Sequence, residues 1–369
     1  MTSTAPFRAD LVGSFLRPQA LKAARAQRDT GEITADELKA IEDDEITKLV
    51  RHQEACGLQL ATDGEFRRAW WHFDFLGLLD GVDLVEAEQG IQFAGVQTKA
   101  QTLKVSGKVD FPDDHPFLDH FRFLKATTKV TPKMTIPAPT VLHFRGGRRA
   151  ISETVYPDMD GFFHDAGHAY AKAVKAFYDA GCRYLQFDDT AFAYLCSPAE
   201  REKAKQRGDD TEGLQEKYAQ MINIALAAKP DDMTITTHIC RGNFRSTWVS
   251  EGGYEPVAET LLARCNYDGY FLEYDSERAG GFEPLRFLPK GHKRVVLGLI
   301  TSKSGTLESR DEIKRRIEEA GKFAPVGQFC LSPQCGFAST EEGNELTENQ
   351  QWAKMREVVA IANEVWGDK

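Results

Sequence analysis

Residues 233–240 of the 369-residue chain read MTITTHIC, and the next two residues are Arg241 and Gly242. The β-branched run predicts a strand that ends at Arg241-Gly242. Side chains on a strand alternate between its two faces, so His238 and Cys240 point the same way. On a helix the same spacing would place them on nearly opposite sides. An imidazole and a thiol directed at one point indicate a metal site at the end of this strand.

Seven other short apolar runs also predict strands, and helical patterns with apolar residues three and four positions apart separate most of them. The predicted strands are residues 9–15, 58–64, 133–139, 183–189, 233–240, 269–275, 294–301 and 328–334. The predicted helices are residues 34–56, 160–180, 211–228, 308–321 and 345–366.

Strands that alternate with helices favour a parallel sheet with right-handed crossovers. Eight such units predict an α/β fold of the (β/α)8 TIM-barrel type. A doubly wound sheet is the alternative, but no glycine-rich nucleotide-binding motif follows the first predicted strand. Residues 80–130 interrupt the alternation and predict a β-hairpin excursion between the second and third units. A segment of about 50 residues is small for an independent core, so we expect residues 1–369 to form a single catalytic barrel.

Polar residues suited to binding or catalysis follow nearly every predicted strand. Active sites of such barrels lie at the carboxyl ends of the strands, so these residues are expected to meet there. In chain order, the strand ends carry Gly13 and Ser14; Asp63, Gly64 and Glu65; Pro137, Ala138, Pro139 and Thr140; Asp188 and Asp189; His238 and Cys240; Glu273; Thr301 and Ser302; and Cys335.

Four of these residues form the predicted metal site: His238, Cys240, Glu273 and Cys335. One imidazole, two thiolates and one carboxylate favour tetrahedral Zn²⁺ over magnesium or calcium. Cys330 competes with Cys335 for the last position, but it lies inside the apolar run FCLSP, where burial is expected.

A second candidate pair is His164 and His168 in HDAGH, whose spacing places two ligands on one helix face. No third ligand is apparent for this pair in the sequence, so the strand-end site is favoured. His72 and His143 are expected to pack in the core or to line the pocket.

Composition argues against several classes of protein. The formal net charge is −10 and no concentrated basic run occurs, which argues against a nucleic-acid partner. No apolar run approaches the ~20 residues of a membrane span, and the first residues lack the pattern of a signal peptide. Seven irregularly spaced cysteines argue against a disulfide framework. We therefore expect a cytoplasmic protein that binds neither membrane nor nucleic acid and that could form a homodimer.

Several motifs resemble the cobalamin-independent methionine synthase family: HIC, FLEYD and SPQCGF, with VGSFLRP near the start and TDGEFRR after the second predicted strand. The likeness runs along almost the whole chain. It is to the family's catalytic C-terminal barrel, and above all to short single-barrel members similar to methyltetrahydropteroyltriglutamate–homocysteine methyltransferase. The resemblance implies a zinc-dependent S-methyltransferase that makes methionine from homocysteine, with 5-methyltetrahydrofolate or a related molecule as methyl donor.

The resemblance also implies roles for individual residues. His238, Cys240, Glu273 and Cys335 correspond to the zinc ligands. Ser14 and Glu65 correspond to contacts with the amino-acid end of homocysteine, and Asp188 to the catalytic aspartate that holds the substrate ammonium.

These roles agree with the chemistry of the side chains. Two carboxylates, Glu65 and Asp188, around one ammonium would form a charge-assisted clamp. Alternatively, one of Asp188 and Asp189 only caps the following helix. Zinc coordination removes the proton of a thiol and fixes its sulfur. Glu273 is the weakest donor to a soft metal, so we expect it to loosen as a substrate sulfur enters.

The chain differs from the family at positions that the resemblance assigns to the methyl-donor site. The family's catalytic histidine after the seventh strand is absent from GLITSKSG, where Thr301 and Ser302 stand. The folate-stacking tryptophan is replaced near His143 and Phe144. An altered pocket or a surface stack could be built from Arg67, Arg68, Trp70 and Trp71.

These departures leave alternatives open. A related alkyltransferase could use a methylcorrinoid donor, or could act on another thiol such as coenzyme M. A structural or redox-sensing zinc site is a further alternative, and so is a hydrolase that uses zinc-bound water. A carboxylate ligand at the mouth of a large barrel favours catalysis over a structural site, and thiolate-rich ligation disfavours the hydrolase.

Overall fold

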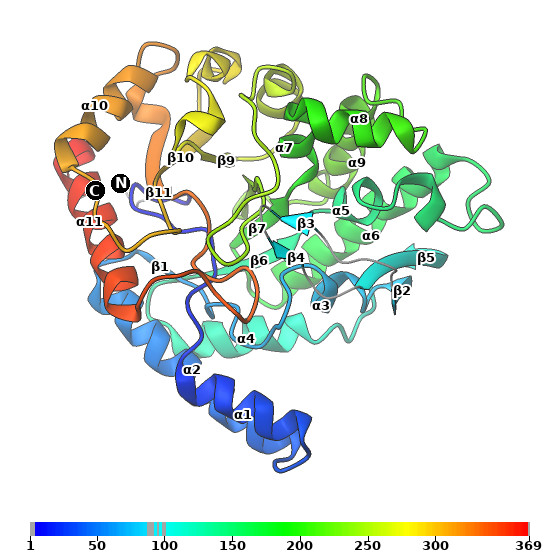
Figure 1. The fold of residues 1–369 in the computed structure, drawn as a ribbon, viewed down its shortest axis with the longest axis horizontal. Coiled ribbons are helices and arrows are strands. Elements are labelled where there is room, and N and C mark those ends of the chain that lie inside the picture. Colours follow the sequence, from blue (N-terminus) through cyan, green and yellow to red (C-terminus); the bar gives the residue numbers. More distant parts are fainter. Residues whose placement is uncertain (1–3, 87–91, 94–95, 98–100, 368–369) are drawn as a thin grey trace.

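The computed structural model describes residues 4–86, 92–93, 96–97 and 101–367, with a curled parallel sheet of seven strands at its centre (Figure 1). Seven of the eight predicted strands are confirmed, and the second of them is short. In spatial order the strands are β1 (Leu60–Ala61), β6 (Thr131–Pro137), β7 (Tyr184–Asp189), β8 (Thr234–Ile239), β9 (Gly269–Glu273), β10 (Arg294–Ile300) and β11 (Phe329–Pro333).

The central strands are buried along their whole length, as expected for parallel strands covered on both faces. Their register aligns the polar residues at the carboxyl ends. Asp188 of β7 lies opposite His238 of β8, and Glu273 of β9 lies opposite Gly298 of β10. One edge of the sheet therefore collects side chains that are far apart in sequence.

Residues 9–15, predicted as the first strand, form an extended segment instead of a regular strand. Ala9 makes an isolated parallel bridge with Leu331 of β11, and the Phe15 N–H donates to the Gly64 carbonyl beyond β1. The segment thus lies between the two edge strands of the sheet. The Asp10 carboxylate accepts the Leu11 N–H, so this donor is taken by a side chain instead of a strand ladder.

Helices cover the outside of the sheet, and the five predicted helices are all confirmed (Figure 1). They are α2 (Ala35–Ala55), α6 (Met159–Asp179), α9 (Leu214–Leu226), α10 (Arg310–Ala320) and α11 (Glu348–Trp366). The expected start of α2 is a capping box, in which the Thr34 side chain and the Glu37 side chain each accept the other's backbone N–H.

Other helical segments were not predicted. The α-helices are α1 (Gln19–Asp29), α3 (Phe73–Leu76), α4 (Phe117–Thr127), α5 (Val141–Phe144), α7 (Ala191–Cys196) and α8 (Pro198–Gln206). The crossover from β8 to β9 contains a π-helix, η2 (Glu259–Arg264). The 3₁₀ turns are η1 (Gly147–Ala150), η3 (Glu277–Ala279), η4 (Glu283–Phe287) and η5 (Val326–Gln328).

The segment between β1 and β6 carries an antiparallel pair, β2 (Asp80–Glu86) and β5 (Gln101–Asp110). Two short strands, β3 (Gln92–Phe93) and β4 (Val96–Gln97), pair within the same segment. Residues 87–91, 94–95 and 98–100 of the predicted hairpin lie outside the described residues.

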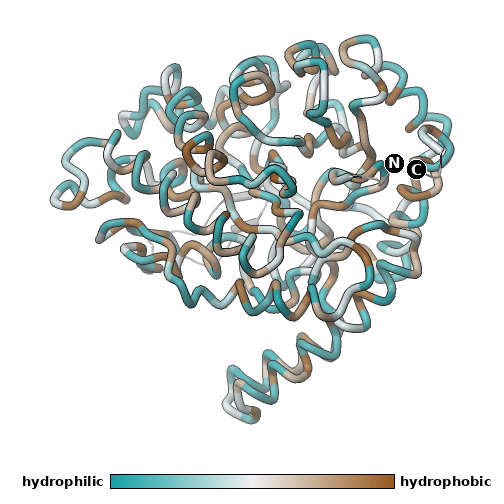
Figure 2. Tube along the Cα trace, turned by 180° about the vertical axis from the view of Figure 1, so that it is seen from behind, coloured by the Kyte–Doolittle hydropathy of each residue, from teal (hydrophilic) through white to brown (hydrophobic). Residues whose placement is uncertain are grey.

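Hydrophobic residues concentrate toward the centre of the fold and hydrophilic ones over the outer helices (Figure 2). Across the described ranges, no helix combines the length and the apolar character that a membrane crossing requires.

A buried ion pair lies within this core. Lys133 of β6 and Asp10 are both fully buried, with Nζ 3.1 Å from Oδ1. The second Asp10 oxygen accepts the Phe7 N–H and the Tyr184 hydroxyl. The Lys133 ammonium also lies 4.0 Å from the centre of the Phe271 ring. These contacts attach residues 7–11 to three strands of the sheet.

Replacing Asp10 with Ala is expected to lower the free energy of unfolding by about 3–5 kcal/mol, because Lys133 would keep a buried, unpaired charge. Urea unfolding followed by tryptophan fluorescence measures this change. The control is Asp179→Ala, which removes the exposed pair with Lys175 and should change stability by less than about 1 kcal/mol. Equal losses of unfolding free energy in the two variants would contradict the proposed contribution of the buried pair to stability.

Candidate metal centre and substrate cavity

The structure brings His238, Cys240, Glu273 and Cys335 together at the carboxyl edge of the sheet. His238 is the fifth residue of β8 and Cys240 directly follows that strand, so the two-residue period of a strand directs both inward. Glu273 is the last residue of β9. Cys335 follows β11 by two residues.

One donor atom from each of the four side chains lies within 4.8 Å of all the others. The two Sγ atoms are 3.8 Å apart, and His238 Nε2 lies 3.9 Å from Glu273 Oε1. Two sulfurs bound tetrahedrally at about 2.3 Å from one zinc ion would be separated by about 3.8 Å. The donor set and its spacing therefore fit a zinc ion.

The electrostatic state of these groups also fits a cation site. Burial raises the pKa of the Glu273 carboxyl and lowers the pKa of His238 to about 3. The hydrogen bond with Cys335, together with burial, raises the pKa of the Cys240 thiol well above its usual range. The surroundings thus disfavour the charged forms of Glu273, His238 and Cys240, and a bound divalent cation would offset that penalty.

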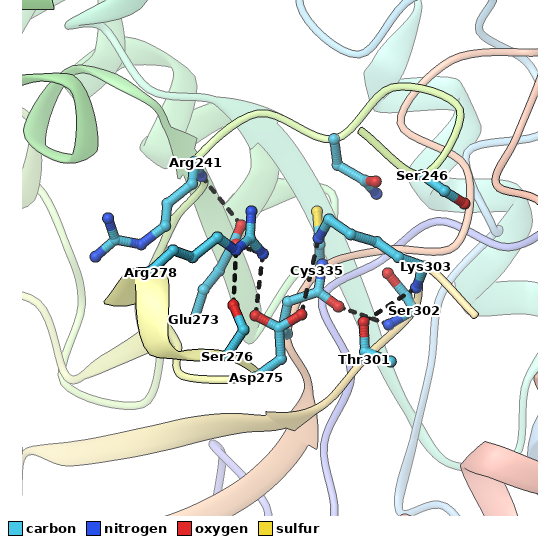
Figure 3. Close-up of polar contacts among 12 residues, drawn as sticks. Arg241, Ser246, Glu273, Asp275, Ser276, Arg278, Thr301, Ser302, Lys303 and Cys335 are labelled. Carbon is cyan, nitrogen blue, oxygen red and sulfur yellow. Dashed lines mark hydrogen bonds and ion pairs between the residues drawn. The ribbon is translucent and has the colours of Figure 1, made fainter. Parts of the chain in front are cut away.

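Glu273 is held by groups outside the four-residue cluster (Figure 3). Its Oε1 accepts the Arg241 backbone N–H at 3.0 Å, and its Oε2 lies 3.4 Å from Nη2 of Arg278. One oxygen therefore faces His238, and the other faces a guanidinium group.

A cavity opens beside the cluster. His238, Cys240 and Cys335 form part of its wall. The remaining lining includes three of the predicted substrate contacts, two tryptophans, one arginine and several small polar residues. They are Ser14, Glu65, Trp70, Trp71, Arg145, Asp188, Thr190, Asn243, Ser339 and Thr340.

Two buried carboxylates, Glu65 and Asp188, line this cavity and differ in their partners. Glu65 Oε1 forms an ion pair with Arg68 and accepts the Thr135 hydroxyl. Asp188 Oδ1 accepts the amide of Gln186 at 2.7 Å. Burial and the neighbouring Glu65 carboxylate raise the pKa of Asp188 to about 7. A cationic group entering the cavity would find an acceptor here.

Ser14 lies against the loop that carries Cys335. Its hydroxyl accepts the Ala338 N–H at 3.2 Å. A Cβ atom at position 336 would lie 1.9 Å from Ser14 Oγ, so only glycine fits between the two segments. Gly336 thus allows the loop that carries Cys335 to touch Ser14.

Asp189 does not share the position of Asp188. Its Oδ1 accepts the Ala191 N–H at the start of α7, and its Oδ2 accepts the Thr140 hydroxyl. Asp189 therefore binds the first N–H of α7, although the N-cap residue of this helix is Thr190.

The arginine and tryptophan side chains of residues 67–71 contact different parts of the protein. Trp70 and Trp71 line the cavity, whereas Arg68 binds Glu65. Arg67 points away and pairs with Glu42 and Asp43 of α2. The two tryptophans therefore line the cavity beside the cluster, whereas Arg67 and Arg68 line a different pocket.

The other histidines lie outside the cluster. His164 and His168 face each other on an exposed part of α6, with their Nε2 atoms 3.1 Å apart. No metal-site group of three or more among the described residues includes them. His72 accepts a hydrogen bond from Trp70, and His143 Nδ1 bonds with the Tyr218 hydroxyl.

Sequence reasoning missed Arg278, which lies 3.4 Å from Glu273, and Lys303, which lies 4.0 Å from Asp275. It also missed Arg145 and Thr190 on the cavity wall. Of the four, Lys303 alone had a signal, since it follows Thr301 and Ser302 in the loop after β10.

Comparison with known proteins identifies the family. The family model described as "Cobalamin-independent synthase, Catalytic domain" matches residues 7–363, so the chain belongs to this family. YxjG of Bacillus subtilis strain 168, a protein of uncharacterised activity, is 55% identical over 362 residues, which are 98% of this chain and 95% of that protein.

Two further comparisons extend the likeness. A Listeria monocytogenes protein, solved as a candidate vitamin-B12-independent methionine synthase, has a TM-score of 0.80 and 47% identity, with 99% of each chain covered. A 5-methyltetrahydropteroyltriglutamate–homocysteine methyltransferase of Bacillus cytotoxicus is 24% identical over 90% of this chain and 40% of its own length.

Replacing Cys335 with Ser is expected to weaken zinc binding by about 100-fold or more, because a thiolate donor to a soft metal is lost. Zinc content after dialysis, measured by mass spectrometry, gives the result, and circular dichroism checks the fold. Cys330→Ala is the matched control, since Cys330 is buried on β11 and contacts the Pro6 carbonyl. Full zinc retention in Cys335→Ser would contradict the ligand assignment.

Proposed function

We propose that this member of the cobalamin-independent methionine synthase family is a zinc-dependent S-methyltransferase. It transfers a methyl group to the thiol of homocysteine and forms methionine. The methyl donor is 5-methyltetrahydrofolate or a close relative of it, in keeping with the name of the Bacillus cytotoxicus relative. Residues 1–369 act as one catalytic unit, a proposal supported by a cavity whose wall runs from Val12 to Thr340.

One observation carries this proposal. The buried carboxylates Glu65 and Asp188 share a single cavity with His238, Cys240 and Cys335. A ligand that extends from the carboxylates to the cluster needs a cationic end and a soft donor at the other end. Homocysteine has both, an ammonium and a thiol.

Different residues of the site have different roles in the proposed reaction. His238, Cys240, Glu273 and Cys335 hold the metal ion, which when bound lowers the pKa of the substrate thiol and fixes its sulfur. Asp188 and Glu65 hold the substrate ammonium, and Ser14 lies beside them at the cavity wall. Asp188 Oδ1 also lies 3.8 Å from His238 Nδ1, so the proposed ammonium clamp lies close to the proposed metal ligands.

The wall of the cavity also orients the second substrate. Trp70 and Trp71 offer flat apolar faces and Arg145 a cation, which suits a ring that carries an acidic tail. With both substrates in line, the sulfur attacks the methyl carbon. The bond from carbon to nitrogen breaks, its electron pair stays on the nitrogen, and that nitrogen takes up a proton.

The same features argue against the alternatives. Coenzyme M carries a sulfonate, which two buried carboxylates would repel. A structural zinc site is usually closed on all sides, whereas three of the four cluster residues here line a cavity.

The proposal is tested by mixing zinc-loaded protein with L-homocysteine and 5-methyltetrahydropteroyl mono- or triglutamate and measuring methionine. Methionine formation that disappears after zinc removal and returns with added zinc is the expected result. Turnover with methylcobalamin and none with either folate would overturn the donor assignment and leave the thiol assignment in place.

Replacing Asp188 with Asn is expected to lower kcat/KM for homocysteine by about 10- to 150-fold, because a hydrogen bond to a charged group is lost. The zinc content should stay unchanged. The comparison substrate is 4-mercaptobutyrate, which is homocysteine without the amino group. If Asp188 binds the ammonium, Asp188→Asn and the wild type should differ little with this thiol. An equal loss with both thiols would remove Asp188 from the clamp.

A further inference from the structure

Next to Glu273 lie three charged residues that we call the counter-charge cluster: Asp275, Arg278 and Lys303 (Figure 3). Asp275 and Arg278 come from the loop after β9, and Lys303 comes from the loop after β10. The proposed methyl transfer assigns them no part.

Arg278 connects this cluster to Glu273. Its Nη2 lies 3.0 Å from Asp275 Oδ1 and 3.4 Å from Glu273 Oε2, so the two carboxylates share one nitrogen. The guanidinium is fixed from other directions by the Ser276 hydroxyl at 2.9 Å and by the Trp248 ring at 5.0 Å. Arg278 is therefore a rigid donor rather than a mobile surface side chain.

Two buried donor atoms of the counter-charge cluster are unpaired. Within the described part of the chain, the buried Arg278 Nη1 and Lys303 Nζ atoms have no hydrogen-bond partner. Lys303 Nζ stands 4.0 Å from Asp275 Oδ2, too far for a hydrogen bond. Buried donors of this kind are costly unless a partner is supplied.

The charge of the counter-charge cluster is also unbalanced. Arg278 and Lys303 contribute two positive charges and Asp275 one negative charge, so one further carboxylate would make the group neutral. Glu273 is the nearest such carboxylate, and one of its oxygens already faces Arg278.

We propose that Arg278 and Lys303 form the receiving site for the Glu273 carboxylate when a substrate thiol takes its place at the metal. The inference rests on the proposed function, because it requires a thiol that enters the metal site. In the resting protein Glu273 is a metal ligand with one oxygen toward Arg278. When the thiol enters, Glu273 turns to Arg278 Nη1 and Lys303 Nζ, which supply the missing hydrogen bonds.

Charge is balanced in this exchange. The thiol loses its proton to the solvent, and its sulfur brings one negative charge to the metal in place of the carboxylate. Glu273 keeps its own negative charge and neutralises the excess positive charge of the counter-charge cluster. Without Arg278 and Lys303 the displaced carboxylate would remain buried and unpaired, which disfavours thiol entry.

The experiment combines calorimetric titration of the zinc-loaded protein with L-homocysteine and X-ray absorption at the zinc edge. In the wild type a third sulfur neighbour is expected to replace one oxygen neighbour. Lys303→Met and Arg278→Met are each expected to keep one zinc ion and to bind homocysteine about tenfold more weakly or worse. Lys303→Arg should restore most of the affinity, because the guanidinium again offers a charged donor.

Lys293→Met is the matched control, since Lys293 is a part-buried lysine just before β10 whose ammonium bonds with the Cys265 carbonyl. It should bind homocysteine as the wild type does. Unchanged affinity in both Lys303→Met and Arg278→Met would overturn the receiving site while the proposed function stands. Zinc loss from these variants would also overturn it, because the pair would then hold the resting metal site. A wild type in which no third sulfur appears would overturn both proposals.

Discussion

The ion pair between Lys133 and Asp10 is the constraint on which the rest of the fold depends. Two charges without solvent contact are tolerated only where every surrounding group is in place. Asp10 holds the first extended segment, and Lys133 holds β6 beside it. Ser14 lies four residues beyond Asp10, so the same pair sets where the substrate cavity begins. An interaction in the interior of the sheet thereby positions groups at its carboxyl edge.

The buried carboxylates at the carboxyl edge of the sheet differ in the partners that offset their negative charge. Glu65 has Arg68 as an ion-pair partner, and Glu273 has Arg278. Asp188 has a neutral amide as its hydrogen-bond partner, and its pKa is raised to about 7. Of the two carboxylates that line the cavity, Asp188 is therefore the one without an arginine as hydrogen-bond partner. The protein thus carries an electrostatic preference for a cationic ligand before any substrate arrives.

The metal-site residues could be predicted because each obeys a local rule. His238 and Cys240 share one strand face, Glu273 is the last residue of β9, and Cys335 follows β11 in the same parallel sheet. Arg278 and Lys303 obey no such rule, because they come from irregular loops whose meeting depends on the whole sheet. Arg67 and Arg68 show the same limit, since adjacent residues outside regular structure point to different partners.

The irregular first segment could not be predicted for a related reason. Its apolar residues have the pattern of a strand, but the Asp10 carboxylate takes up the Leu11 N–H that a strand ladder would use. Side-chain competition of this kind depends on whether the carboxylate is held in the interior, and here Lys133 holds it. A pattern of apolar residues does not contain that information.

The close approach of Gly336 to Ser14 has a thermodynamic consequence. The loop that carries Cys335 cannot shift without moving the serine, because the space for even one methyl group is missing between them. Under the proposed function, metal binding at the cluster and homocysteine binding beside Ser14 are therefore linked. By reciprocity, an ion that orders this loop strengthens amino-acid binding by the same factor by which the amino acid strengthens retention of the ion. The cell's supply of the metal would then tune how much amino acid the protein holds.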